Sequence, residues 1–177
     1  MKVNVMISKA NKALVFSSVP LWEAHLADTL EIVSSLCASG VDVIFLSCDG
    51  VLNSCAVNPY HKLSLCRLCR STTQLVEANL SSLCEVKRLS FKNIMLDKNI
   101  SDVELNSMDD LLNFRYKNMR VGALAASQLA DDKRGVYFDF TDAKIKTRIQ
   151  DLIFNGINLY EESLELIRKN KINEVYV

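Results

Sequence analysis

The hydrophobic pattern in the first part of the chain alternates between short apolar runs and one helical repeat. Residues 13–18 and 41–46 are short apolar runs of the kind that forms buried strands. Between them, over 21–39, apolar side chains recur at steps of three and four residues, which indicates a helix. Pro20 suits the first turn of that helix, and Gly40 stands where its C-cap is expected. This succession predicts a βαβ unit, and therefore a parallel sheet with a right-handed crossover.

The rest of the chain carries further helical and extended patterns. They predict helices over 63–83 and 101–114, a third strand or extended connector over 86–94, close packing of small residues over 118–129, and one long helix over 141–170, broken or bent near Asn155-Gly156. We therefore expect an α/β fold, a Rossmann-like parallel sheet flanked by helices, as a single domain over residues 1–177. Because the chain stops within a strand pattern at Val175-Tyr176-Val177, we expect it to be a fragment of a longer two-domain protein.

Charge and apolar content narrow the classes of function. The 177 residues include 21 Lys plus Arg and 21 Asp plus Glu, for a formal net charge of +0. This balance predicts no strong field for nucleic acid or an anionic membrane surface. No stretch reaches the roughly 18 apolar residues that a membrane span needs, and the first residues lack the apolar region of a secretory signal. We therefore predict a cytoplasmic protein that has no membrane span and binds no nucleic acid.

The six cysteines of the chain need a role other than disulfide formation, because thiols stay reduced in the cytoplasm. Four of them, Cys48, Cys55, Cys66 and Cys69, lie in the segment 48–70 and are separated by six, ten and two residues. Two thiolates separated by two residues can both reach one tetrahedral ion at about 2.3 Å, and the other pair would complete a four-thiolate site. The sequence thus predicts a cysteine-rich metal-binding loop after the second strand, with zinc as the metal.

The composition of the segment 48–70 supplies a physical reason for a metal. It contains turn formers such as Asn58-Pro59 and few apolar anchors, so ordering it costs conformational entropy. A structural zinc contributes about 10–16 kcal/mol in peptides and could hold such a segment in place. Arg67 and Arg70 would then help to balance the negative charge of a zinc–tetrathiolate centre.

The four cysteines of this segment are also compatible with three roles other than zinc binding. An iron–sulfur cluster uses the same set of four thiolates, and a redox dithiol at Cys66 and Cys69 is a further alternative. His61 could replace one cysteine as a ligand. Some of the four could be small buried hydrophobes, which is the role that we expect for Cys37 and Cys84 on helical faces.

Asp49 and Gly50 are further candidates, because they follow the second predicted strand. Ligands of α/β proteins bind at the carboxyl ends of strands, although a tight turn is the plainer interpretation of this dipeptide. The chain contains no GxGxxG, P-loop or GxSxG motif. No pair of residues forms a recognisable catalytic arrangement, so the sequence assigns no catalytic residue.

Two blocks of the chain resemble a known family. The first runs from Phe45-Leu46-Ser47-Cys48-Asp49-Gly50 through Cys55 and Asn58-Pro59 to Cys66-Arg67-Leu68-Cys69-Arg70-Ser71. The second and shorter block comprises Tyr116-Lys117, Val121-Gly122 and Ala125-Ala126-Ser127. Over residues 13–130, the chain resembles the N-terminal region of glycosyltransferase-like proteins of bacterial capsular polysaccharide and O-antigen biosynthesis.

The resemblance implies a two-domain sugar transferase of the GT-B type, in which two Rossmann-like halves face each other across a cleft. This chain would be the acceptor-side half of a protein that uses a nucleotide sugar and a glycan or lipid-linked acceptor. Arg67 and Arg70 could then meet the phosphate of a substrate, near Asp49 and Gly50. The second half is missing, so the chain alone is expected to be inactive. The alternatives are a non-catalytic zinc-stabilised interaction module and an iron–sulfur or redox-sensing domain.

Overall fold

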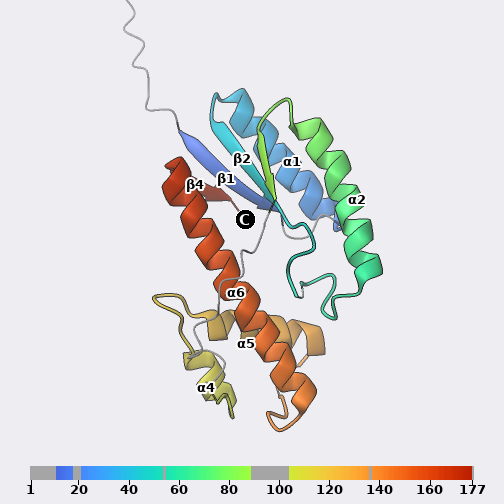
Figure 1. Cartoon of the computed structure of the whole chain (residues 1–177), viewed down its shortest axis with the longest axis vertical. Helices are drawn as coiled ribbons and strands as arrows, with labels where there is room; N and C mark the ends of the chain where they lie inside the picture. The colour runs from blue at the N-terminus through green and yellow to red at the C-terminus, as the bar shows by residue number, and fades with distance from the viewer. Residues whose placement is uncertain (1–10, 18–20, 54, 89–103, 136, 177) are drawn as a thin grey trace, which may run out of the picture. The chain divides into compact units, whose positions relative to one another are not determined.

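The computed structural model describes residues 11–17, 21–53, 55–88, 104–135 and 137–176 (Figure 1). Its elements in chain order are β1 (Lys12–Ser17), α1 (Glu23–Ala38), β2 (Asp42–Ser47), α2 (Leu63–Leu80), β3 (Glu85–Arg88), α4 (Met108–Asn113), α5 (Val121–Lys133), α6 (Ala143–Asn170) and β4 (Glu174–Tyr176). The chain divides into two compact units. Unit 1 comprises Met1–Gly50, Ser64–Leu89 and Leu164–Val177, and unit 2 comprises Val51–Leu63 and Ser90–Ser163.

Unit 1 is built around a four-stranded parallel sheet in the order β3-β2-β1-β4 (Figure 1). The register pairs Ser17 of β1 with Ser47 of β2, and Ser47 with Arg88 of β3. These three residues are the last of their strands. The carboxyl ends of β1, β2 and β3 therefore lie side by side, and we call this side of the sheet, together with the turn at residues 48–50, the carboxyl edge.

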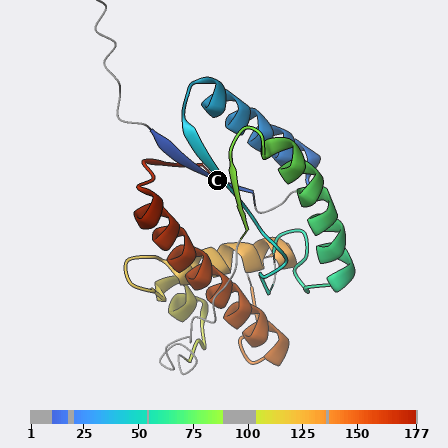
Figure 2. The ribbon, with the colours of Figure 1, turned by 45° about the horizontal axis from the view of Figure 1, so that its top comes forward.

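The two central strands are buried on both faces. Val15, Val43 and Phe45 belong to a core cluster that also contains side chains of α1 and α2, and both helices lie on the same side of the sheet (Figure 2). Leu14 and Ile44 alternate with these residues, point to the other face and are buried as well. Burial on both faces explains why β1 and β2 are continuous apolar runs rather than alternating ones.

Unit 2 is helical in the part that the structure describes. Its core contains Leu111 of α4, Val121 and Leu129 of α5, and Ile149 and Ile153 of α6, all buried. α6 begins in this unit, and its last residues, from Leu164 on, are counted with unit 1. Thus the α/β part of the fold is unit 1, and unit 2 is a separate set of packed helices.

Two glycines allow the helices of unit 2 to pack closely. A Cβ added at Gly122 of α5 would lie 1.8 Å from the carbonyl oxygen of Leu111 and 2.8 Å from Cβ of Phe114. A Cβ added at Gly156 of α6 would lie 2.8 Å from Cγ2 of Val121. The close packing predicted for the small residues is therefore confirmed. Of the break or bend predicted near Asn155-Gly156, the break is wrong, because α6 is continuous there and Gly156 packs against α5.

The other predicted elements agree with the structure to different extents. An α/β fold with a parallel sheet flanked by helices is confirmed, as are the strands near 13–18, 41–46 and 175–177 and the helices near 21–39 and 63–83. Within 86–94, residues up to Arg88 form β3, and the remainder lies outside the described residues. The helix predicted over 101–114 begins only at Met108, because the side chain of Ser107 caps it by accepting a hydrogen bond from the amide of Asp110 at 3.1 Å. Residues 101–103 lie outside the described part.

Among the described residues, none of the helices is both long enough and apolar enough to cross a membrane. α6 is the longest of them, and it carries charged side chains in its last turn.

The substitution Gly122→Ala tests the helix packing of unit 2. The added methyl group would overlap the Leu111 carbonyl, so we expect the free energy of unfolding to fall by about 1–3 kcal/mol. Gly135→Ala is the control, since the nearest atom to its added Cβ is 3.9 Å away. Urea unfolding followed by circular dichroism measures both, and equal stability of the two variants would contradict the packing argument.

Candidate functional site

Polar side chains gather at the carboxyl edge of the sheet. Ser17 and Ser47 end β1 and β2 and are 6% and 1% exposed. Arg88 ends β3. In open α/β sheets, ligands bind outside the carboxyl ends of the strands, near the point where the strand order reverses. That point lies here between β1 and β4, where β4 joins the opposite side of β1 from β2. The polar cluster shares the carboxyl ends of the strands with such sites, but it lies at the ends of β2 and β3.

Buried Glu77 is the centre of the polar cluster at this edge. It projects from the sheet-facing side of α2 and is 6% exposed. The hydroxyl of Ser47 donates to Oε1 of Glu77 at 2.5 Å. Nε and Nη2 of Arg88 donate to Oε2 of the same carboxylate at 3.0 and 2.6 Å. One carboxylate thus ties together β2, α2 and β3.

The partners of Glu77 determine its ionisation. Burial by itself raises the pKa of this carboxyl group, but hydrogen bonds from Arg88 and Ser47, with the positive charge of Arg88, outweigh burial. The pKa of Glu77 therefore lies below its ordinary value. Hydrogen bonding to Glu77 and its negative charge raise the pKa of Arg88 in turn. The pair is ionised at neutral pH.

Asp49 and Arg70 form a second ion pair at the same edge. Nε of Arg70 lies 3.0 Å from Oδ1 of Asp49, and Nη2 of Arg70 donates to Oδ2 of Asp49 at 3.4 Å. The Arg70 and Asp49 side chains are 48% and 30% exposed. Gly50 turns the chain with φ +75°, a conformation that glycine adopts without strain. A Cβ added there would lie 3.7 Å from Cδ of Arg70.

The two ion pairs are close enough to interact. Ser47, two residues before Asp49, pairs with Arg88 in the register of β2 and β3, and the charge of Asp49 is a minor cause of the raised pKa of Arg88. Two arginines and two carboxylates sum to zero charge, so the cluster offers both donors and acceptors without a net field. Such a cluster can bind hydroxyl groups or exchange a carboxylate for another anion.

The residues predicted to bind substrate do not all lie together in the structure. Asp49, Gly50 and Arg70 lie together at the carboxyl edge, whereas Arg67 is exposed on α2. The sequence pattern did not single out Glu77 or Arg88. A signal for Glu77 was present, because it stands between Thr73 and Leu80 at helical spacing on the buried side of α2.

The four cysteines of the predicted metal site are divided between the two units. Cys66 and Cys69 lie on α2, one helical turn apart, and Cys48 directly follows β2. These three belong to unit 1, and Cys55 belongs to unit 2. A Cβ added at Gly50 would lie 3.7 Å from Cβ of Cys66. In the described part of the chain, however, no group of three or more histidine, cysteine, aspartate or glutamate side chains is placed to hold a metal ion.

The residues around Cys55 are linked by hydrogen bonds. The backbone of Cys55 pairs with that of Asn58 in an isolated bridge. The side chain of Asn58, which is 4% exposed, accepts from the amide of Lys62 at 2.8 Å and donates to the carbonyl of Lys62 at 2.9 Å. Leu52 is 6% exposed and provides an apolar anchor. These contacts give the segment local anchors besides any metal, and the metal site stays a prediction.

His61, the alternative ligand, is part of the same loop of unit 2. Its Nδ1 lies 2.7 Å from the carbonyl oxygen of Leu52, so Nδ1 donates to this oxygen. Its backbone has φ +47°, which is unusual for a residue other than glycine. A histidine that ligates a metal typically donates its other ring nitrogen in this way. Even so, His61 joins no group of ligands among the described residues.

Cys37 lies on α1 as predicted, whereas Cys84 follows α2 instead of lying on a helical face, and both are half-buried. Both pack against the core cluster of the sheet and α1. Sγ of Cys37 donates to the carbonyl of Leu83 at 3.4 Å. Burial is the main cause that raises the pKa of both thiols, which disfavours the reactive thiolate form. These two cysteines therefore behave as core residues.

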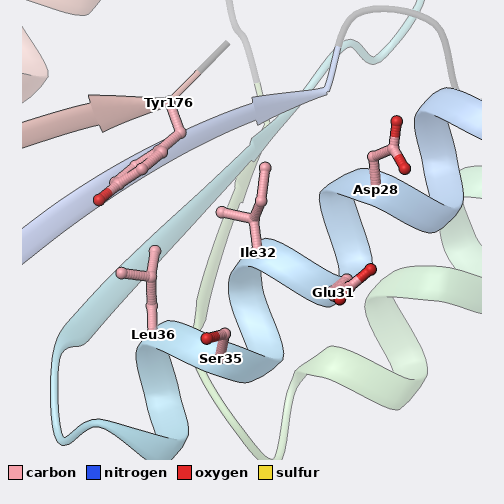
Figure 3. Close-up of a pocket in the computed structure, with 6 residues that line it drawn as sticks. All are labelled: Asp28, Glu31, Ile32, Ser35, Leu36 and Tyr176. Atoms are coloured by element: carbon pink, nitrogen blue, oxygen red, sulfur yellow. The ribbon is translucent and has the colours of Figure 1, made fainter.

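A groove between α1 and β4 is a second concave feature of unit 1 (Figure 3). It is lined by Asp28, Glu31, Ile32, Ser35 and Leu36 of α1 and by Tyr176 of β4. Ile32 and Leu36 supply apolar surface, and Asp28 and Glu31 make its α1 side acidic. The hydroxyl of Tyr176 donates to Glu174 at 2.7 Å. These described lining residues include no basic side chain, so the groove differs from the carboxyl edge, where each carboxylate meets an arginine.

The chain matches no protein-family model, no curated protein and no solved structure. The candidate site therefore rests on the geometry of this chain, and the family suggested by the resemblance remains a hypothesis.

The variant Glu77→Gln tests the polar cluster. We expect it to lower the free energy of unfolding at pH 7 by roughly 1.5–3 kcal/mol, the usual contribution of hydrogen bonds to a charged group. Because the pKa of Glu77 is lowered on folding, its stabilising effect is present above the ordinary value of 4.5 and is lost as the pH falls through the folded-state value. The dependence of stability on pH below pH 5 should thus be flatter in Glu77→Gln than in the wild type.

The control for this experiment is Glu85→Gln on β3, whose side chain is 51% exposed and pairs with Lys87. It should change stability by less than about 0.5 kcal/mol. Identical pH profiles for the wild type and Glu77→Gln would contradict the role of Glu77.

Elemental analysis tests the predicted metal site. The chain, purified without chelators, is expected to contain about one zinc per molecule and to be colourless, whereas an iron–sulfur protein is brown. Cys66→Ser should lower the melting temperature sharply if Cys66 is a ligand, and Cys84→Ser should lower it modestly as a core substitution. Absence of bound metal, or equal and small effects of both substitutions, would contradict the site.

Proposed function

We propose that this chain is the N-terminal, acceptor-side half of a glycosyltransferase of bacterial surface polysaccharide (capsule or O-antigen) biosynthesis, and that it binds substrate at the carboxyl edge of its sheet. The family assignment in this proposal comes from the resemblance of the block from Phe45 to Ser71. The predicted zinc site and the alternative of an iron–sulfur or redox-sensing domain stay predictions.

The observation that carries the proposal is the polar cluster at the carboxyl ends of parallel strands. Polar groups are buried there at a cost, and they are retained with full hydrogen bonding between Ser47, Glu77 and Arg88. Arg88 pairs with the buried carboxylate of Glu77 and still leaves 46% of its side chain exposed at this edge. A binding role explains both the buried anchor and the exposed guanidinium.

The chemistry of sugar transfer suits such a cluster. A glycosyltransferase displaces a nucleoside diphosphate from its sugar, and the leaving phosphate needs positive charge or hydrogen-bond donors. Arg70 and Arg88 can supply donors, and the carboxylates of Asp49 and Glu77 can accept hydrogen bonds from hydroxyl groups of a sugar. We assign these residues to binding and orientation, and assign proton transfer to none of them.

A second candidate function is a non-catalytic interaction module. The observation that favours it is the groove between α1 and β4, in which Ile32 and Leu36 face Tyr176. Val175, which is also on the edge strand β4, is half-exposed. Exposed apolar side chains beside a sheet edge are common at protein interfaces. Such a module would release no nucleoside diphosphate, which separates it from a transferase.

Release of UDP or GDP from nucleotide sugars tests the transferase proposal. The longest natural form of the protein that contains these residues is mixed with UDP- or GDP-sugars and a bacterial glycan or glycolipid acceptor. We expect release above the rate without acceptor, and at least about tenfold slower release for Arg70→Gln, since one charge-assisted hydrogen bond to the leaving group is worth this factor.

The control is Arg168→Gln, an exposed residue in the last turn of α6, which should keep wild-type activity. A folded wild-type protein that releases no nucleoside diphosphate from any UDP- or GDP-sugar would overturn the transferase proposal and favour the interaction module.

A further inference from the structure

Asp49 lies beside two arginines at the carboxyl edge. It pairs with Arg70 through both of its oxygens, and it stands two residues after Ser47, which pairs with Arg88 in the register of β2 and β3. We propose that the carboxyl edge binds a diphosphate group between Arg70 and Arg88, and that Asp49 occupies this position in the ligand-free chain. The inference rests on the proposed function, because it names the part of the substrate that this edge would hold.

The contact between Arg70 and Asp49 has the geometry of oxyanion recognition. Nε and Nη2 of Arg70 approach Oδ1 and Oδ2 of Asp49 at 3.0 and 3.4 Å. This side-on arrangement, with two parallel N–H groups facing two oxygens, is the one that arginine uses for phosphate as well as for carboxylate. The carboxylate of Asp49 therefore stands in for two oxygens of a phosphate.

Arg88 is held in place from the inside of the protein. Nε and Nη2 bind the buried carboxylate of Glu77, and Ser47 fixes that carboxylate from the other side. The orientation of the guanidinium is thus set before any ligand arrives. A preorganised donor loses less entropy on binding than a freely rotating one.

Charge balance explains why Asp49 must be displaced. Arg70 and Arg88 carry two positive charges, and Asp49 and Glu77 carry two negative charges, so the ligand-free cluster is neutral. Glu77 is buried and cannot leave, whereas Asp49 is 30% exposed and stands next to the turn at Gly50. Exposed ion pairs of this kind contribute only about 0–1 kcal/mol, so a diphosphate with two or more negative charges can replace Asp49 on Arg70.

Binding of inorganic pyrophosphate to the chain, measured by isothermal titration calorimetry, tests the proposal. Asp49→Asn removes the competing carboxylate but keeps the shape of the side chain, so it should tighten pyrophosphate binding by up to about fivefold. Arg70→Gln should weaken it by at least about tenfold. Arg168→Gln is the matched control, since it removes one exposed positive charge in unit 1, and it should change the affinity less than about twofold.

Two sources of diphosphate are distinguished by further titrations. UDP and GDP represent a nucleotide donor, and farnesyl diphosphate represents a lipid-linked acceptor. Tighter binding of UDP or GDP than of pyrophosphate identifies a nucleotide donor, and tighter binding of farnesyl diphosphate identifies a lipid-linked acceptor. Arg88→Gln also removes a partner of buried Glu77, so each variant is first checked for a native circular dichroism spectrum. If Arg88→Gln does not fold, the test rests on the affinity of Arg70→Gln.

The direction in which Asp49→Asn changes the affinity for pyrophosphate decides whether the proposal holds. Weaker or unchanged pyrophosphate binding by folded Asp49→Asn would overturn the proposal, as would equal losses in Arg70→Gln and Arg168→Gln. This outcome is independent of the transferase assay. Diphosphate binding without sugar transfer would contradict the proposed function alone, and sugar transfer without the Asp49 effect would contradict this inference alone.

Discussion

The buried carboxylate of Glu77 is the polar interaction on which the geometry of the carboxyl edge depends. It joins the last residue of β2, the sheet-facing side of α2 and the last residue of β3 through Ser47 and Arg88. An ionised carboxylate that is 6% exposed would be costly without such partners. Because the cost is offset only in this arrangement, the ends of β2 and β3 keep a fixed relation to α2. Arg70, about two helical turns before Glu77 on the same helix, is positioned by the same interaction.

The carboxyl edge combines a fixed inner ion pair with an exchangeable outer one. Glu77 and Arg88 form the inner pair, in which the Glu77 side chain is buried, and Asp49 and Arg70 form the outer pair, with side chains that are 30% and 48% exposed. Breaking a buried pair is strongly destabilising, whereas an exposed pair contributes little. A ligand can therefore compete for the outer pair without disturbing the inner one. This difference is what allows one small cluster to be both part of the fold and a binding surface.

The sequence was sufficient for the parts of the fold that depend on local patterns. Continuous apolar runs predicted β1 and β2, and helical periodicity predicted α1 and α2, because burial and helix geometry act over a few residues. Asp49 was a candidate because it follows a strand. The pairing of Asp49 with Arg70 could not be predicted, since it joins residues 21 positions apart through a turn whose direction depends on Gly50. The pairing of Glu77 with Arg88 could not be predicted either, because it depends on the register between β2 and β3.

The segment 48–70 shows why polarity alone is a weak argument for a metal. Part of it is helix, since α2 begins at Leu63, and so Cys66 and Cys69 stand on regular secondary structure. In the loop before α2, Asn58 makes two side-chain hydrogen bonds to the backbone of Lys62, and the backbone of Cys55 and Asn58 closes a turn. Asparagine commonly orders turns in this way, because its side chain can mimic a backbone group. Turn-forming residues thus reduce the entropy cost that a metal was expected to offset, and the spacing of the cysteines is the argument for zinc that remains.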